Sequence, residues 1–225
     1  MNFEQMTEQD VLIRNYRRMT EAVREYVKEL SFYARRMEYL AERDPFTGSF
    51  NRTVLPRRLK NAIELAKISR LGVAVMFVDL DNFKLVNDRY GHDTGDAVLA
   101  EIGLRFPEHA SDMCCVIRQG SDEFVVILEG ISGQDDVMGF VERFIAALSQ
   151  PIDVGPEKIT ITASIGISLF PEHGDNVDTL LHQADIAMIG AKAVPDNSFC
   201  FYEKKMSEAQ DRVRLTDELE ASPEA

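Results

Sequence analysis

Residues 72–80 read GVAVMFVDL, a continuous apolar run with Asp79 close to its end. An apolar run of this length predicts a buried strand. Amphipathic patterns that are typical of helices follow and precede it, at residues 94–106 and 52–70. Alternation of strands and helices along the chain indicates a single α/β domain.

The remaining segments complete this pattern. Residues 113–118 and 123–128 are predicted strands, and the segment between them, QGSD, carries a hairpin signal. Gly120 followed by Ser121 suits a type II′ turn. Further helices are expected at 134–149 and 176–192, and further strands at 151–154, 157–168 and 198–202. This order predicts an α/β (α+β) fold with a split βαβ, ferredoxin-like sheet flanked by helices.

A different pattern occupies the N-terminal region. Apolar residues recur there with alternating spacings of 4 and 3: Leu12, Tyr16, Met19, Val23, Tyr26, Leu30, Tyr33, Met37 and Leu40. These positions form a stripe with the 3.5-residue period of a coiled coil, and Pro45 and Gly48 end the helical stalk. We expect a parallel homodimer through residues 12–40. The alternative is an amphipathic helix that packs on its own domain.

Composition excludes several classes of protein. Hydrophobic residues make up 45% and charged residues 28%, as in ordinary globular proteins, and the net charge of −13 argues against binding to nucleic acid or an anionic membrane surface. No apolar run has the length of a membrane span, and the first residues lack the features of a signal peptide. With 3 Cys and no zinc-like Cys/His spacing, we expect a cytoplasmic protein without a disulfide framework.

Aspartates cluster within residues 79–96: Asp79, Asp81, Asp88, Asp93 and Asp96. Asp79 ends a buried strand, where open α/β sheets commonly bind ligands, and Asp122 and Glu123 lie at the hairpin tip. If the hairpin neighbours the Asp79 strand, the three carboxylates repel one another, and bound Mg²⁺ would relieve that repulsion. A receiver-like or purely structural arrangement is the alternative. Asp81 either shares the side of Asp79 or caps a helical turn that starts at Phe83.

These residues also carry a resemblance. The segment RQGSDEF (118–124) resembles the signature of the GGDEF family of diguanylate cyclases, with Ser121 in place of the second Gly. DPFTGSFNR (44–52) and DLDNFKLVNDRYGHDTGD (79–96) are similar to the N-terminal motif and the metal and guanine block of that family. ITASIGIS (161–168) and ADIAMIGAK (184–192) match two further blocks in order. The resemblance covers residues 44–202 and implies a palm-type central sheet.

The resemblance implies an activity and roles for individual residues. Family members condense two GTP molecules into cyclic di-GMP and release pyrophosphate. Asp122 would be the catalytic base, and Mg²⁺, with Mn²⁺ as an alternative, would be held by Asp79, the Leu80 carbonyl, Asp122 and Glu123. The substrate-binding positions would be Phe83, Lys84, Asn87, His92, Asp96, Arg118, Gly120, Ser121 and Lys192.

Within this set, Asn87 and Asp96 would bind the guanine edge, because a site built for guanine leaves its polar groups unpaired against another base. Lys84, Arg118 and Lys192 would contact phosphates. Each residue taken singly also has a structural interpretation: Asn87 and Asp96 as caps, His92 as a surface histidine, Phe83 as core, and the lysines as solvated side chains.

The chain departs from the family pattern at three places. Ser121 replaces Gly, which would be strained if that position required positive φ. Residues 111–114, SDMC, stand where the family often has the Arg-x-x-Asp site of product inhibition, so we expect no inhibition through that site. Residues 195–198, PDNS, replace Gly-Arg-Asn-Arg, so a phosphate-binding Arg is lost.

We therefore expect three domains: a coiled-coil helix at 1–43, a GGDEF domain at 44–202 and a helical linker at 203–225. The linker resembles the one that joins GGDEF domains to an EAL phosphodiesterase domain, which suggests a fragment of a longer signalling protein with a sensory domain upstream. Three functions compete: an active diguanylate cyclase, a GTP-binding domain of weak or no activity that regulates a fused EAL domain, and a structural dimerisation unit.

Overall fold

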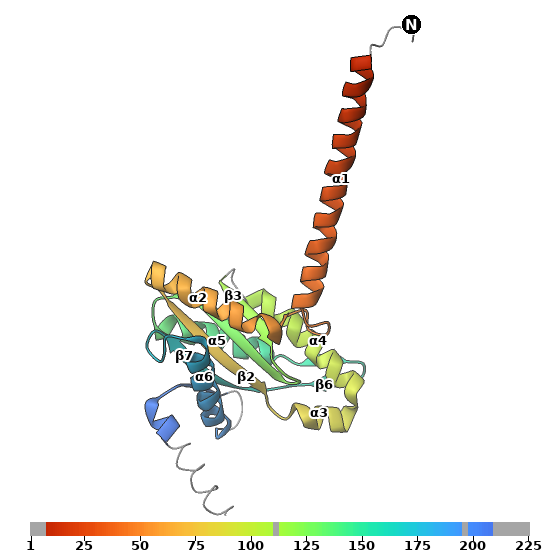
Figure 1. Cartoon of the computed structure of the whole chain (residues 1–225). Helices are drawn as coiled ribbons and strands as arrows, with labels where there is room; N and C mark the ends of the chain where they lie inside the picture. Colours follow the sequence, from red (N-terminus) through yellow and green to blue (C-terminus); the bar gives the residue numbers. More distant parts are fainter. Residues whose placement is uncertain (1–7, 110–112, 195–197, 209–225) are drawn as a thin grey trace, which may run out of the picture. The chain divides into compact units, whose positions relative to one another are not determined.

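The computed structural model describes residues 8–109, 113–194 and 198–208 (Figure 1). The predicted linker beyond residue 208, the residues before 8, and the departures at 111–112 and 195–197 lie outside the described residues. The chain forms two compact units, one within residues 1–42 and one within residues 43–225. No described helix combines the length and the apolar character that a membrane crossing needs.

The larger unit is built on a mixed sheet. Its strands are β1 (Phe50–Asn51), β2 (Gly72–Leu80), β3 (Cys114–Arg118), β4 (Glu123–Ile131), β7 (Ala163–Phe170) and β8 (Phe199–Phe201), in the order β1-β3-β4-β2-β7-β8. The four inner strands pair antiparallel, and the short edge strands β1 and β8 pair parallel with their neighbours. Because β4 is inserted between β2 and β3, the inner strands have the predicted split βαβ, palm-like arrangement.

Helices cover both faces of this sheet (Figure 1). The helices are α2 (Leu55–Ser69), α3 (Phe83–Tyr90), α4 (His92–His109), α5 (Gln134–Leu148) and α6 (Val177–Lys192), with a short 3₁₀ turn, η1, at Arg52–Val54. One core joins α4 and α5 to the sheet, and a second core joins α2 and α6 to the other face. Successive β2 residues alternate between these cores: Val75 faces α2 and α6, and Met76 faces α4 and α5.

Side-chain alternation along β2 decides which face receives its acid. Asp79 has the parity of Val73 and Val75, so its carboxylate lies on the α6 side of the sheet. Glu123 of β4 pairs with Asp79 in register and therefore shares that side. The fold thus places two acids opposite each other on one face before any ligand is considered.

The smaller unit is a single helix, α1 (Glu8–Glu42), of 35 residues. The helix confirms the predicted stalk, and all of its predicted heptad positions are exposed, from 53% at Tyr33 to 70% at Leu12. In proteins, helices gain most of their stability from packing of an apolar face rather than from propensity alone.

Two local predictions were wrong. The expected strand 157–168 divides into β6 (Glu157–Ile159), which pairs with β5 (Ile152–Val154) in a separate hairpin, and β7. The chain leaves strand geometry at residues 160–162, where Thr162 bonds to Asp81 instead. The hairpin turn is not type II′, since neither Gly120 nor Ser121 is among the described residues with positive φ.

Candidate functional site

The predicted acids meet at one edge of the sheet. Asp79 pairs directly with Glu123 across the antiparallel β2–β4 ladder, and the backbone amide of Leu80 donates to the carbonyl of Asp122 at 3.1 Å. Directly opposed residues bring their Cβ atoms within about 5.5 Å, so like charges there repel. The condition set by the sequence, that the hairpin should neighbour the Asp79 strand, is therefore met.

The electrostatics of this edge reflect that proximity. Burial raises the pKa of Asp79 above 3.8, and the charges of Asp122 and Asp81 raise it further, although Lys192 opposes them. Burial likewise raises the pKa of Glu123 above 4.5, with additional effects of Asp79, Asp122 and Asp185. Both carboxylates thus hold negative charge at a free-energy cost that a bound cation would remove.

Lys192 supplies the cation in this structure. Its Nζ lies 2.9 Å from Oδ2 of Asp79, and the Asp79 side chain is 13% exposed against 44% for Lys192. Among the described residues, no three His, Cys, Asp or Glu side chains are close enough together to hold a metal ion. The donor set nevertheless suits Mg²⁺, because Asp79 and Glu123 face each other with raised pKa values, and Asp122 and the Leu80 backbone adjoin them.

Arg118 organises the signature loop. Its Nε donates to the carbonyl of Gly120 at 3.0 Å and its Nη2 to that of Ser121 at 2.8 Å, while Nη1 lies 3.0 Å from Oδ1 of Asp44. The side chain is only 12% exposed. These contacts occupy the guanidinium with the protein itself, whereas the sequence assigned it to a phosphate. Arg118 therefore acts first as a support of the loop.

Asp44 is the other half of this support. Its Oδ1 accepts from the amides of Phe46 and Thr47, from the Thr47 hydroxyl and from Arg118. Burial alone would raise the pKa of Asp44, but the Thr47 and Arg118 contacts outweigh it and hold the pKa below 3.8. The DPFTG motif carried the signal for this residue, although the sequence did not assign it a role.

Gly120 and Ser121 of the signature loop lie against the two acids that follow them, Asp122 and Glu123. Gly120 is exposed, and a Cβ there would lie 2.9 Å from Oε2 of Glu123, so glycine lets the loop approach that carboxylate. Ser121 needs no strained backbone, and its hydroxyl donates to Oδ1 of Asp122 at 2.5 Å. The substitution in the signature therefore adds a hydrogen bond to the predicted base.

The predicted guanine residues lie on a different pair of elements, α3 and α4. Phe83 is buried in the core at 3% exposure, Asn87 of α3 is half-buried, and Asp96 of α4 is exposed. Lys84 and His92 are exposed. Asn87 thus has a defined packing environment, whereas the two basic residues are free to follow a ligand.

Asp81 has a structural role that the sequence left open. It accepts from the Thr162 hydroxyl at 2.6 Å and the Ser164 hydroxyl at 2.7 Å, one at each carboxylate oxygen. Its amide donates to the carbonyl of Thr162. The side chain of Asn82, not Asp81, occupies the position before α3, and it makes no capping bond. Asp81 therefore ties β2 to β7 beneath the acid edge.

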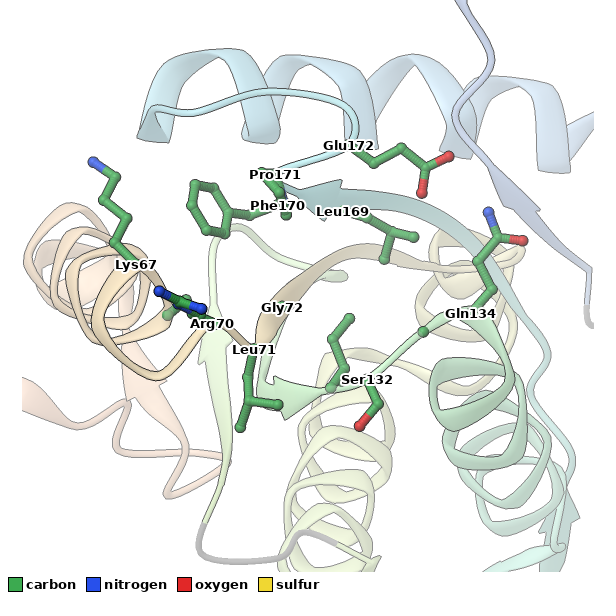
Figure 2. A pocket seen from close by; sticks show the side chains of 13 residues that line it. Lys67, Arg70, Leu71, Gly72, Ser132, Gln134, Leu169, Phe170, Pro171 and Glu172 are labelled. Carbon is green, nitrogen blue, oxygen red and sulfur yellow. The ribbon is translucent and has the colours of Figure 1, made fainter.

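Two cavities lie at opposite ends of the strands. One of about 380 Å³ is lined by Asp79, Lys192 and their neighbours, including Asp81, Asn82, Thr162, Ser164 and Val194. The other, of about 560 Å³, lies at the beginning of β2 and the ends of β4 and β7. Figure 2 shows Lys67 and Arg70 on one side of it and Gln134 and Glu172 on the other. The first cavity is lined by Asp79, a carboxylate with a raised pKa, which favours this cavity as the functional site.

Comparison with known proteins gives the family. The family profile described as "Diguanylate cyclase, GGDEF domain" matches residues 41–198. A bifunctional diguanylate cyclase/cyclic di-GMP phosphodiesterase of Pseudomonas aeruginosa, MucR, is 37% identical over 186 residues, which are 82% of this chain and 27% of MucR. The diguanylate cyclase TpbB of the same species is 35% identical over 193 residues, or 84% of this chain and 43% of TpbB.

Solved structures agree with the sequence matches. The GGDEF domain of TpbB from Pseudomonas aeruginosa superposes with a TM-score of 0.72 at 35% identity, and the match covers 75% of this chain and 99% of that domain. The chain spans less than half the length of the curated relatives MucR and TpbB. The sheet order, the acid edge and these matches together lead to one conclusion: the chain belongs to the GGDEF family of diguanylate cyclase domains.

Proposed function

We propose that this domain is a divalent-metal-dependent diguanylate cyclase that condenses two GTP molecules into cyclic di-GMP and releases pyrophosphate. The observation that carries the proposal is the in-register pair of Asp79 and Glu123 beside Asp122, with raised pKa values at both members of the pair. Phosphoryl transfer needs positioning and charge neutralisation more than covalent chemistry by the protein. This edge is suited to both.

The residues divide into two groups in the proposed reaction. Asp79, the Leu80 carbonyl, Asp122 and Glu123 would hold Mg²⁺ or Mn²⁺, which supplies positive charge for the triphosphate. Asp122 would accept the proton of the 3′-hydroxyl of one GTP. The 3′-oxygen would then bond to the α-phosphorus of the other GTP, and pyrophosphate would leave. Lys192 would turn from Asp79 to the phosphates, since its side chain is 44% exposed.

The remaining predicted positions would bind the nucleotide. Asn87 and Asp96 would pair with guanine, with Phe83 shaping the pocket and His92 beside the nucleotide. Lys84 would join Lys192 at the phosphates, and the amides of Gly120 and Ser121 would cradle them. Arg118 would contribute by holding that loop, because its donors already bind Gly120, Ser121 and Asp44.

A cyclase needs two GTP-loaded domains that face each other, and we propose that α1 brings them together as a homodimeric coiled coil. Its stripe at residues 12–40 is exposed and has the period of a two-stranded seam. Light scattering should give the mass of a dimer for the full chain and of a monomer after removal of residues 1–43. An unchanged oligomeric state would contradict the coiled coil.

The second candidate is a GTP-binding domain of weak or no activity that regulates a fused EAL phosphodiesterase. The loss of the Arg after Lys192 favours it, because the one lysine that remains there already pairs with Asp79. The name of MucR combines a diguanylate cyclase with a cyclic di-GMP phosphodiesterase, which supports such a fusion in a longer form of this protein.

One assay separates the two candidates. The chain is incubated with GTP and Mg²⁺, and cyclic di-GMP is measured by chromatography, with the Asp122→Asn variant as the matched control. Product from the wild type and at least a 100-fold loss in the variant support the cyclase. Binding of GTP without product supports the regulatory domain. Full activity of Asp122→Asn would refute the assigned base.

A further inference from the structure

The side chain of Asn87 packs directly against Gly95. Gly95 lies in the first turns of α4 and is buried, and Asn87 belongs to α3, which precedes it. A Cβ added at Gly95 would overlap Oδ1 of Asn87, would lie 3.0 Å from its Cγ and would lie 3.3 Å from Cζ of Phe83. The Asn87 amide therefore occupies space that only glycine leaves open.

The backbone between the two residues keeps this contact in place. The amide of Gly91 donates to the carbonyl of Asn87 at 2.9 Å, and the amide of Gly95 donates to the carbonyl of Gly91 at 3.2 Å. Gly91 has φ of 87°, a left-handed conformation that turns the chain sharply from α3 into α4. The two helices, which adjoin in Figure 1, thus meet at the Asn87–Gly95 contact, with Asp96 as the next residue of α4.

We infer that Gly95 is a positioning residue for base specificity: it seats the Asn87 amide beside Asp96, so that the two side chains can address a guanine edge together. The inference rests on the proposed binding of GTP at this site. A side chain at residue 95 would displace the Asn87 amide while leaving Asp96 and the acid edge untouched. Discrimination between guanine and adenine would fall, because Asn87 would no longer bind the guanine edge together with Asp96.

Substitution at Gly95 can test this role without unfolding the protein. The clash is with the end of a flexible side chain, which can rotate, and Ala is a better helix former than Gly. Other buried glycines differ in this respect. At Gly103 an added Cβ would overlap the backbone carbonyl of Thr47, and at Gly166 it would overlap the backbone of Ala184 and Met188. Those two glycines are required because backbone atoms crowd them, whereas at Gly95 the overlap is with the Asn87 side chain, and Phe83 Cζ comes no closer than 3.3 Å.

The experiment measures binding of α,β-methylene GTP and α,β-methylene ATP to the full chain by calorimetry in Mg²⁺, since these analogues cannot be condensed. The variants are Gly95→Ala, Asn87→Ala and the double variant. Gly139→Ala in α5 is the matched control, because its Cβ would meet only Nη1 of Arg143, at 3.5 Å. Thermal unfolding of each variant checks that the fold is retained.

We expect Gly95→Ala to bind the GTP analogue about tenfold more weakly with an unchanged affinity for the ATP analogue and no loss of thermal stability. Asn87→Ala should lose a similar factor, and the double variant should bind no worse than Asn87→Ala alone, because the clash disappears with the side chain. Gly139→Ala should bind as the wild type does.

Three results would overturn the inference. If the wild type binds the GTP analogue and Gly95→Ala binds it equally well, the positioning role of Gly95 is refuted and the proposed function stands. If the losses of the two single variants multiply in the double variant, Gly95 acts independently of Asn87 and the positioning role is refuted as well. If the wild type binds no guanine nucleotide, both the proposed function and the positioning role of Gly95 are refuted.

Discussion

Acids occupy two kinds of place in this domain, and their surroundings differ. Asp44 and Asp81 lie in the supporting structure, where their carboxylates accept hydrogen bonds: Asp44 from Thr47 and Arg118, and Asp81 from Thr162 and Ser164. Asp79 and Glu123 lie at the edge, where they face each other and Lys192 pairs with Asp79. Acids that are satisfied by donors hold the fold together, whereas acids that repel one another are available to a cation.

The sharpest test of this difference replaces one aspartate of each kind, Asp79 and Asp81, with asparagine. Asp79→Asn should reduce cyclase turnover at least 100-fold, because it removes a proposed metal ligand. Thermal stability should be kept, because burial and neighbouring acids make the Asp79 charge unfavourable in the folded state. Asp81→Asn should do the reverse, with a loss of about 1–2 kcal/mol of stability, since an amide can accept from only one of the two hydroxyls. Cyclic di-GMP formation and thermal unfolding measure the two effects. Equal behaviour of the two variants would abolish the distinction.

A second test addresses the supporting side alone. Arg118→Lys should cost about 2 kcal/mol of stability, because a lysine cannot reach the carbonyls of Gly120 and Ser121 and the carboxylate of Asp44 at once. Urea unfolding measures the loss, and Lys60→Arg on the exposed face of α2 is a control that should be silent. If Arg118→Lys lowers turnover but leaves stability unchanged, the guanidinium serves the substrate rather than the loop.

The two kinds of acid should also respond to pH with opposite signs. Asp79 and Glu123 have raised pKa values, so the folded state binds protons more tightly than the unfolded state, and stability should rise as pH falls from neutrality through their folded pKa values, above 3.8 and 4.5. Asp44 has a lowered pKa, so the stability it gives is lost as pH falls through a value below 3.8.

Thermal unfolding in metal-free buffer between neutral and acidic pH checks both signs. Asp79→Asn should flatten the rise in stability on acidification, and the loss at still lower pH should remain. Stability that falls steadily from neutral pH downwards in the wild type would contradict the assignment of repulsion to this edge.

The smallest expected effect concerns the substituted signature residue. Ser121→Gly should raise turnover by no more than about threefold, because it removes an exposed hydrogen bond to Asp122 without a change of backbone region. Ser121→Thr keeps the hydroxyl and should behave as the wild type. Initial rates at saturating GTP measure both, and a large loss in Ser121→Gly would show that the serine is required rather than tolerated.

Local patterns in the sequence were sufficient for most elements and for the list of acids. The run at 72–80 became β2 with its predicted bounds, and the heptad became α1. Period and composition determine such elements because each depends on neighbours within a few residues. The II′ turn and the strand 157–168 were wrong because Arg118 binds the loop carbonyls and Asp81 draws Thr162 out of the strand. The Asp81–Thr162 contact joins residues that lie far apart in the sequence, whereas the Arg118 contacts are local but depend on a side chain outside the turn itself.

The site shows the same division. The motifs named Asp79, Asp122 and Glu123, and the parity of β2 placed Asp79 on one face. The resemblance assigned Asp79 to the metal, but parity left the role of Asp81 open, because Asp81 would lie on the same side as Asp79. Hydrogen bonds from Thr162 and Ser164 give Asp81 a structural role. Asp79 instead pairs with Lys192 at the end of α6, a partner that a bound cation can replace.

By itself, the sequence determined which residue types recur at which period, and hence the stalk, the central strand and the chemistry of the edge. The tertiary structure decided which acids receive donors and which face each other, that Arg118 supports the loop, and that Gly95 makes room for Asn87. The physical reason is range: periodicity reports burial along one element, whereas charge repulsion, hydrogen bonding and steric fit depend on side chains that only the folded chain brings together.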